Sequence, residues 1–327
     1  MQAWILDESP GSYRFGEADV PEPAADEVRV RIVASALNHM DLWLTRGMPK
    51  PRLPHVPGCD GAGVIDAVGD EVTDVAPGDE VVINPALSCR RCHACLAGNG
   101  PYCRKFQILG EQRAGAHAEF VVVPAANVSP KPAGRTWEDV AAFGLCTLTA
   151  WRMLRRARVV AGETVLVVGV GGGVSSAGLM LAKAMGARVF ATSRDASKRD
   201  RAVELGAEGA FDSGGDFGVK ADVVLENVGA ATWERSLRAL VPGGRLVTCG
   251  GTAGPVVEVN LPKLFFKQHE LIGSTMGSYA EWDEVMALVG AGLPVVVDEV
   301  VDGLAGYPGA LERLELGQQL GKIVIRH

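Results

Sequence analysis

The sequence predicts an α/β protein of two domains, and two patterns support this fold class. Residues 1 to about 125 contain short alternating segments that end at Gly or Pro, such as EVRVRIVASAL and GAGVIDAVG. From about residue 136, helical patterns alternate with short apolar strands and glycine turns. Period-two alternation favours antiparallel strands, whereas strands separated by helices at this interval predict a parallel sheet. A chain of 327 residues is long enough for two separate cores.

The composition excludes several classes of function. A hydrophobic content of 47% and a charged content of 22% are typical of a soluble α/β protein. No apolar run approaches the roughly 18 residues that a membrane span needs. The net charge is −7 and the basic stretches are short, so we expect no nucleic-acid partner. MQAWILDESPG is not a secretory signal, which predicts a reducing, cytoplasmic location without disulfides.

Four cysteines lie in a C-x2-C-x2-C-x7-C spacing within a segment that has neither helical nor strand periodicity. Zinc prefers four soft ligands in a tetrahedron, and two-residue gaps turn successive thiolates inward from a tight loop. We therefore predict one structural zinc, whose four protein ligands leave no position for water. The predicted ligands are Cys89, Cys92, Cys95 and Cys103.

The second half of the chain contains a glycine turn between a strand and a helix. The strand is ETVLVVG, the helix is VSSAGLMLAKAMG, and ARVFATS follows as the next strand. In this context glycines let the backbone approach a pyrophosphate, which rests on the helix N-terminus. The residues predicted to bind a dinucleotide here are Gly169, Gly171, Gly172, Gly173 and Val174, and Val174 or Ser175 takes the place of the usual last glycine.

The residues that end the strand ARVFATS indicate whether the cofactor is NAD(H) or NADP(H). NAD-binding sheets usually place Asp or Glu there to accept hydrogen bonds from the ribose hydroxyls. Here the strand ends in Ser193 and Arg194, with Lys198 four residues further on. A guanidinium and an ammonium suit the 2′-phosphate of NADP(H), although Asp195 could partly neutralise them.

Together these motifs resemble the medium-chain dehydrogenase/reductase superfamily, the group of zinc alcohol dehydrogenases and quinone oxidoreductases. Besides the cysteine loop and the glycine turn, the resemblance is carried by ALNHMDLWLTRG, PGCDGAGVIDAVGDEV, GAHAEFVVVPA, LTAW, VPGGRLVTCGG, GSTMGS and LGKIVI. It implies a groES-like catalytic domain with a partly open β-barrel, formed by residues 1–126 and 268–327, with the zinc lobe at about 85–108. It also implies a doubly wound Rossmann domain at 127–267, with hydride transfer in the cleft between the two domains.

The sequence differs from the zinc alcohol dehydrogenases at the positions that bind their catalytic zinc. In the alcohol dehydrogenases three motifs contribute to the catalytic zinc site. The first is C-x-x-D, which begins with a Cys ligand, and the second is G-H-E, which supplies a His and a Glu. The third is a Cys that lies four residues before the Thr of a T-A/G-aromatic motif. Here these positions hold Asn38, Gly58-Cys59-Asp60 and Leu145. Asn38 begins an N-x-x-D motif, which resembles that of the zinc-free quinone oxidoreductases. The alternative of a substitute metal site stays open, and its candidate ligands are His39, Cys59, Asp60 and Cys146.

Without a catalytic metal, the easier substrates delocalise the charge that they gain, as quinones and α,β-unsaturated carbonyls do. The expected donors to the developing oxyanion are the Asn38 amide and the Thr149 hydroxyl, with Trp43 as an aromatic wall and Cys59 as a further candidate. Gly250, Gly251 and Thr252 end a strand where the nicotinamide half is expected. Each of these residues also fits a plain structural role.

We therefore expect an NADPH-dependent oxidoreductase that reduces a small-molecule quinone or conjugated carbonyl, as a homodimer or homotetramer. Three alternatives remain: an enoyl- or acryloyl-thioester reductase, a zinc alcohol dehydrogenase with atypical ligands, and an NADPH-binding structural protein. The sequence does not rank the acceptors, because loops form the walls of the pocket.

Overall fold

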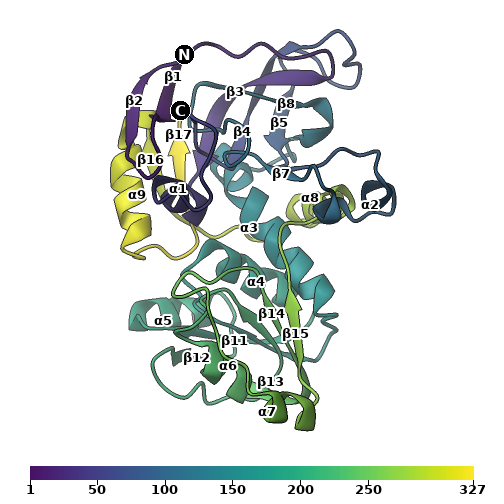
Figure 1. Ribbon diagram of the computed structural model, residues 1–327, viewed down its shortest axis with the longest axis vertical. Coiled ribbons are helices and arrows are strands. Elements are labelled where there is room, and N and C mark those ends of the chain that lie inside the picture. The colour runs from purple at the N-terminus through teal and green to yellow at the C-terminus, as the bar shows by residue number, and fades with distance from the viewer. The chain divides into compact units, whose positions relative to one another are not determined.

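The chain divides into two compact units in the computed structural model, which describes residues 1–327 (Figure 1). Unit 1 comprises Met1–Leu145 and Ser278–His327, and unit 2 comprises Cys146–Gly277. The sequence placed these boundaries at 126/127 and 267/268. Helix α3 (Trp137–Arg156) runs through the first observed boundary, so the helical pattern that begins near residue 136 belongs partly to unit 1.

Unit 1 is built on a seven-stranded sheet in the order β16-β17-β3-β4-β5-β9, with β8 also paired to β3. All its pairs are antiparallel except β16–β17, and the sheet does not close into a barrel. Its strands are β3 (Glu27–Ala36), β4 (Asp60–Val68), β5 (Glu80–Ile83), β8 (Phe120–Pro124), β9 (Val128–Pro130), β16 (Val297–Asp302) and β17 (Lys322–Arg326). The last strand of the chain returns to this sheet, where β17 pairs with β3.

Period-two burial explains why β3 forms a strand. Val28, Val30 and Ile32 face the core of unit 1, and the residues between them are more exposed. Two short antiparallel pairs flank the large sheet: β1 (Gln2–Leu6) with β2 (Tyr13–Glu17), and β6 (Ala86–Leu87) with β7 (Gln107–Ile108). The remaining elements of unit 1 are α1 (His39–Thr45), α2 (His93–Leu96), α8 (Tyr279–Gly290), α9 (Tyr307–Glu315), η1 (Gly100–Tyr102), η2 (Ala125–Asn127) and η3 (Leu304–Gly306).

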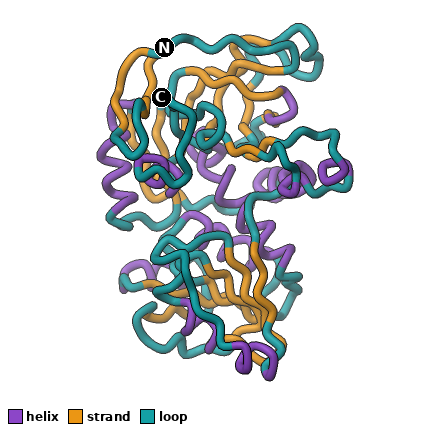
Figure 2. The backbone as a smooth tube through the Cα atoms, viewed as in Figure 1, coloured by secondary structure: helices purple, strands orange, loops and turns teal.

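Unit 2 is a six-stranded parallel sheet in the order β12-β11-β10-β13-β14-β15, with helices packed along it (Figure 2). Its strands are β10 (Thr164–Val167), β11 (Arg188–Ser193), β12 (Gly209–Asp212), β13 (Ala221–Glu226), β14 (Leu240–Thr248) and β15 (Glu270–Gly273). Its helices, besides most of α3, are α4 (Gly173–Ala184), α5 (Ala196–Glu204), α6 (Trp233–Ala239) and α7 (Leu261–Phe266).

The strand order of unit 2 reverses at β10, which pairs with β11 on one side and with β13 on the other. This is the doubly wound arrangement that the alternating helices and strands predicted, and ligands bind such sheets beyond the carboxyl ends of the strands at the reversal. No helix in either unit has both the length and the apolar character needed to cross a membrane.

Candidate functional site

The four predicted zinc ligands converge in the lobe that contains α2. The Sγ atoms of Cys89, Cys92, Cys95 and Cys103 all lie within 4.8 Å of one another. Three of the separations are 3.4 Å (Cys89–Cys103), 3.5 Å (Cys92–Cys95) and 3.9 Å (Cys89–Cys95). Four thiolates at about 2.3 Å from a tetrahedral zinc lie about 3.8 Å apart, so this cluster fits the ion.

Local structure prepares the lobe for thiolates. Hydrogen bonds from the backbone N–H of Arg91 and from the Cys103 side chain lower the pKa of Cys89 to about 6. The backbone N–H of Lys105 also donates to Cys103 Sγ at 3.3 Å. All seven cysteines of the chain are free. In the 327 described residues, this is the one group of three or more His, Cys, Asp or Glu that brings its ligand atoms together.

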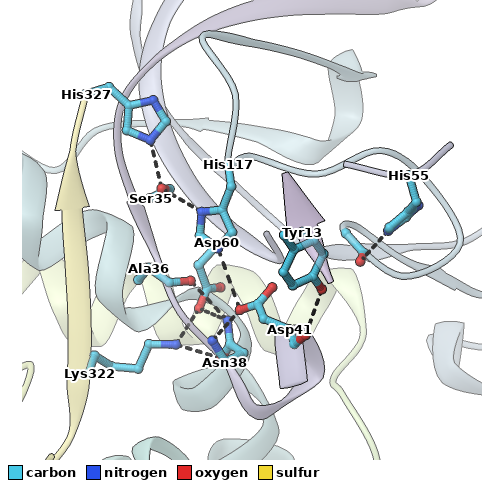
Figure 3. Close-up of polar contacts among 11 residues, drawn as sticks. Tyr13, Ser35, Ala36, Asn38, Asp41, His55, Asp60, His117, Lys322 and His327 are labelled. Carbon is cyan, nitrogen blue, oxygen red and sulfur yellow. Dashed lines mark hydrogen bonds and ion pairs between the residues drawn. The ribbon is translucent and has the colours of Figure 1, made fainter. Parts of the chain in front are cut away.

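A second cluster of unit 1 joins Asn38, Asp60 and Lys322 (Figure 3). The Lys322 ammonium donates to Asn38 Oδ1 at 2.6 Å and to Asp60 Oδ2 at 2.8 Å. Asn38 Nδ2 donates to the same Asp60 oxygen at 2.9 Å and to the Ala36 carbonyl at 3.3 Å. The exposed fractions of Asn38, Asp60 and Lys322 are 5%, 1% and 4%, so the ion pair is shielded from water.

The other carboxylate oxygen of Asp60 is also occupied. The backbone N–H of Leu145 donates to Asp60 Oδ1 at 2.6 Å. A Cβ at the neighbouring Gly144 would lie only 2.5 Å from that oxygen, so the close approach of α3 requires glycine there. Both oxygens of Asp60 therefore have partners from the chain itself.

The residues at the three family zinc-ligand positions do not fit a zinc ion. Asn38 directs its amide oxygen to an ammonium, and Leu145 has no donor atom in its side chain. Cys59 is fully buried, and burial together with the charges of Asp41 and Asp60 raises the pKa of its thiol well above the usual value. Of the alternative ligands within unit 1, His39 makes no convergent group with Cys59 and Asp60. Cys146, the remaining alternative ligand, belongs to unit 2.

Asp41 links Asn38 to a second buried polar chain. Asn38 N donates to Asp41 Oδ2 at 2.8 Å, and His117 Nε2 lies 3.6 Å from the same oxygen. On its other side, His117 Nδ1 lies 2.9 Å from Ser35 Oγ, which lies 2.8 Å from His327 Nε2. The bond from the Asn38 backbone to Asp41 forms part of the N-terminal cap of α1. Sequence reasoning missed His117, although a polar residue inside the apolar segment GAHAEFVVV is a visible signal.

The predicted aromatic wall and the second donor lie in different units. Trp43 is partly buried on α1, with its ring centroid 6.3 Å from that of His39. Burial and the charges of Lys322 and Arg46 lower the pKa of His39. Thr149 lies in α3 within unit 2; its hydroxyl is buried and has no hydrogen-bond partner. Of the two predicted oxyanion donors, the Asn38 amide already donates to Asp60 and Ala36, whereas the Thr149 hydroxyl donates to no group of the protein.

The glycine turn of unit 2 has the geometry of an anion site. Gly169 has φ +70°, and a Cβ there would lie 2.9 Å from Val228. Gly172 precedes α4 and supplies no side-chain cap, which leaves the first-turn N–H groups of the helix to a ligand. Ser175 is buried and donates to the Val168 carbonyl at 2.8 Å, so it is small enough to sit against the strand.

Cations surround the end of β11. Arg194 is exposed and Lys198 is buried on α5. Asp195 caps α5 by accepting hydrogen bonds from Ser197, and these bonds lower the pKa of its carboxyl group. Arg199, which the sequence reasoning missed, donates to the Ser193 carbonyl at 2.9 Å and so lies at the same strand end.

The third predicted cofactor segment follows β14. Thr252 donates through its backbone N–H to the Asn227 carbonyl at 3.3 Å, which joins the loop after β14 to the loop after β13. Gly251 allows close packing here, since a Cβ would lie 3.0 Å from Pro255. Gly250 and Gly251 thus lie at the carboxyl edge of the sheet, as expected from the sequence.

Comparison with known families supports the architecture of both units. Residues 24–133 match the family "Alcohol dehydrogenase GroES-like domain", and residues 173–291 match "Zinc-binding dehydrogenase". A solved NAD-dependent alcohol dehydrogenase is 40% identical, with a TM-score of 0.94 and coverage of 100% of both chains. The chain belongs to the medium-chain dehydrogenase/reductase superfamily. It is therefore an oxidoreductase of that family.

Two other relatives act on thioesters of coenzyme A. The acryloyl-coenzyme A reductase of Metallosphaera sedula is 29% identical over 334 residues, which are 99% of this chain and 99% of the relative. A 2-octenoyl-CoA carboxylase reductase, solved with NADP and 2-octenoyl-CoA, is 28% identical with a TM-score of 0.90. That alignment covers 96% of this chain and 82% of the other.

Proposed function

We propose that this protein is an NADPH-dependent reductase that transfers hydride to a quinone or an α,β-unsaturated carbonyl without a catalytic zinc. The observation that carries the proposal is the Asn38–Asp60–Lys322 cluster. Two of its members occupy motif positions that contribute to the catalytic zinc site in the zinc alcohol dehydrogenases, and they are bonded to an internal ammonium instead. Conjugated acceptors need less electrostatic stabilisation from the protein than simple carbonyls do, because they delocalise the negative charge that hydride transfer creates.

The residues of the chain have distinct roles in this reaction. NADPH, when bound, supplies the hydride. Thr149 donates from its unpaired hydroxyl to the oxygen on which charge develops, and Trp43 packs against a planar acceptor. An unpaired buried hydroxyl costs about 1–3 kcal/mol, so a substrate oxygen that accepts its hydrogen bond removes that cost. Asn38 remains a candidate donor, and Cys59 lines the site as a protonated thiol.

The choice of NADPH rests on the cations at the end of β11. Arg194, Lys198 and Arg199 lie at or beside this strand end, and Asp195 is engaged in capping α5. A phosphate there would form charge-assisted hydrogen bonds. The relatives differ in this respect, since one is described as NAD-dependent and another was solved with NADP. The charge pattern favours NADPH for this chain.

The four-cysteine lobe holds one structural zinc per chain in this proposal. Four thiolates complete a tetrahedral coordination sphere, so the ion supports the fold and takes no part in the reaction. The proposed location is the cytoplasm, where thiols stay reduced.

The proposed assembly is a homodimer formed through the open edge of the unit 2 sheet, from which a tetramer could be built. Strand β15 pairs only with β14, so its outer edge is available to a second copy. Large apolar side chains are exposed on β15 and on or near α7, namely Val256, Leu261, Phe265, Phe266 and Leu271.

A second candidate function is reduction of an enoyl or acryloyl thioester. It is favoured by the two relatives described as acting on acryloyl- and 2-octenoyl-CoA. The chemistry is the same conjugate addition of hydride, and only the acceptor differs. A zinc-dependent alcohol dehydrogenase is a weaker candidate, because it needs ligands that Asn38 and Leu145 do not provide.

The experiment is a screen of NADPH oxidation against quinones, enones, enoyl thioesters and aldehydes. We expect turnover with at least one conjugated class and little with simple aldehydes. Turnover confined to simple aldehydes would refute the proposed function. Absence of turnover with every acceptor would instead favour an NADPH-binding structural protein.

A further inference from the structure

Three residues distant in sequence meet because of the register of the unit 1 sheet. Ala36 of β3 pairs with Asp60 of β4 on one side and with Val324 of β17 on the other. Leu37 N donates to the Ile323 carbonyl at 3.0 Å, which continues the β3–β17 pairing toward residue 38. The antiparallel register therefore brings Lys322 beside Asn38, two residues beyond the Ala36–Val324 pair.

The ammonium fixes the orientation of the Asn38 amide. Lys322 has donors only, so the amide atom that it contacts at 2.6 Å must be the oxygen. The amide nitrogen then faces Asp60 and the Ala36 carbonyl, as Figure 3 shows. A hydrogen bond from a cation to the oxygen also polarises the amide and strengthens its two N–H donors.

The two N–H bonds of Asn38 are unequal. The bond to Asp60 Oδ2 measures 2.9 Å and is charge-assisted. The bond to the Ala36 carbonyl measures 3.3 Å, which is beyond the usual range of about 2.7–3.2 Å. The hydrogen that faces Ala36 is therefore the one that a substrate oxygen can capture at the lower cost.

We propose that Lys322 is a positioning residue of the active site, whose buried ammonium holds and polarises the Asn38 amide for donation to the substrate oxygen. The inference rests on the function proposed above. It gives this chain an internal cation acting through Asn38, where the zinc enzymes of the family use a metal ion. Lys322 itself touches Asn38 and Asp60 and is not required to touch the substrate.

A purely structural ion pair would have different consequences. A buried pair broken on one side destabilises a protein whether or not an active site is near. A positioning role adds two properties that stability alone does not give. Replacing Lys322 must lower kcat rather than raise KM. This decrease in kcat must also disappear when Asn38 has already been replaced.

The turnover test compares Lys322→Met, Asn38→Ala and the double variant, with Lys131→Met as control. Lys131 pairs with Glu80 at 3.1 Å in the same unit, so the control also removes a lysine ion pair. We expect each single change at 322 or 38 to lower kcat at least about tenfold with KM nearly unchanged, as for an interaction made in the transition state. The double variant should lose no more than the worse single variant, and the control should stay within about twofold of wild type.

Two results of the turnover test would overturn the proposal. One is a Lys322→Met variant with wild-type kcat. The other is a double variant whose loss equals the product of the single losses, because independent effects multiply. If Lys322→Met does not fold, Lys322→Gln replaces it, since glutamine still donates a hydrogen bond and lacks only the charge. Wild-type kcat in Lys322→Gln would likewise overturn the role of the ammonium.

A second readout needs no turnover. The side-chain amide of Asn38 gives a pair of proton–nitrogen NMR signals, identified by their loss in Asn38→Ala. We expect these signals to move in Lys322→Gln and to stay in place in Lys131→Met. Unmoved signals would contradict the positioning role even if the wild-type protein reduces every acceptor. Conversely, moved signals in a protein that reduces no acceptor would uphold the placement of Asn38 and refute the proposed function.

Discussion

The backbone N–H of Leu145 donates to Asp60 Oδ1 over 2.6 Å, and this bond joins two positions that belong to the catalytic zinc site in related dehydrogenases. In this chain one of them is an aliphatic residue that contributes only its backbone. The other is a carboxylate whose two oxygens are occupied by Leu145, Asn38 and Lys322. The chain itself therefore supplies partners to both oxygens of Asp60.

The first prediction concerns the zinc lobe. We expect one zinc per chain by elemental analysis, and Cys95→Ser should lower this to near zero and reduce thermal stability. The reason is that the cysteine loop has little apolar packing, so the ion holds it together. His93→Ala is the matched control in the same loop and should keep the metal. Full zinc content in Cys95→Ser would contradict the assignment.

The second prediction concerns the cofactor. Arg194→Ala should weaken NADPH binding about tenfold or more and leave NADH binding nearly unchanged, because a hydrogen bond to a charged group contributes about 1.5–3 kcal/mol. Arg201→Ala is the control, since Arg201 lies on α5, the helix that follows Arg194, and pairs with Glu204. Titration of each variant with both cofactors measures the effect. Equal losses for NADPH and NADH would show that Arg194 does not recognise the 2′-phosphate.

The third prediction separates catalysis from stability at Thr149. Thr149→Val removes an unpaired buried hydroxyl and keeps the shape of the side chain, so the melting temperature should stay the same or rise. The value of kcat should nevertheless fall by about 10²–10³, the usual effect of removing one oxyanion donor. Thr149→Ser is the control that restores the donor. Wild-type kcat in Thr149→Val would exclude the hydroxyl from the reaction.

The fourth prediction concerns acid stability. Burial and the neighbouring His117 lower the pKa of His327 to about 3 in the folded protein, against about 6.5 in the unfolded chain. As the pH falls below about 6.5, only the unfolded state gains this proton, so folding stability is lost between about pH 6.5 and pH 3. His327→Gln should therefore lose less stability than wild type between pH 7 and pH 5 in urea unfolding. His93→Ala, at an exposed position, is the control, and identical pH dependence in His327→Gln and wild type would contradict the prediction.

The fifth prediction concerns assembly. Phe266 is 80% exposed at the end of α7, shortly before β15 begins, so Phe266→Glu should convert the proposed dimer into a monomer, as measured by light scattering. Val203→Glu changes another exposed apolar residue, on α5 beside β11 and β12 at the opposite end of the strand order, and should leave the dimer intact. A dimer that survives Phe266→Glu would place the interface elsewhere.

The sequence predicts most of the fold because its signals are local. The glycine turn, the four cysteines and the alternation in β3 each specify structure within a few residues, and all three appear as expected. The open seven-stranded sheet with a parallel β16–β17 pair is less visible, because it depends on strands that are almost 300 residues apart.

The candidate site is less predictable for the same reason. Asn38, Cys59 and Thr149 are visible in motifs, yet the partner that fixes Asn38 comes from the other end of the chain. Lys322 stands in LGKIVI, a segment whose sequence signal is only that of a strand. Its role depends on the register between β3 and β17, which no short motif encodes.

The central claim is that hydride transfer proceeds here without a metal at the reacting atom. The most direct measurement is turnover of a quinone or enone with NADPH before and after a chelator treatment mild enough to retain the lobe zinc. We predict unchanged kcat, with one zinc per chain in both samples and poor oxidation of simple primary alcohols. Two zinc ions per chain, together with ethanol or benzyl alcohol oxidation that the chelator abolishes, would contradict the claim.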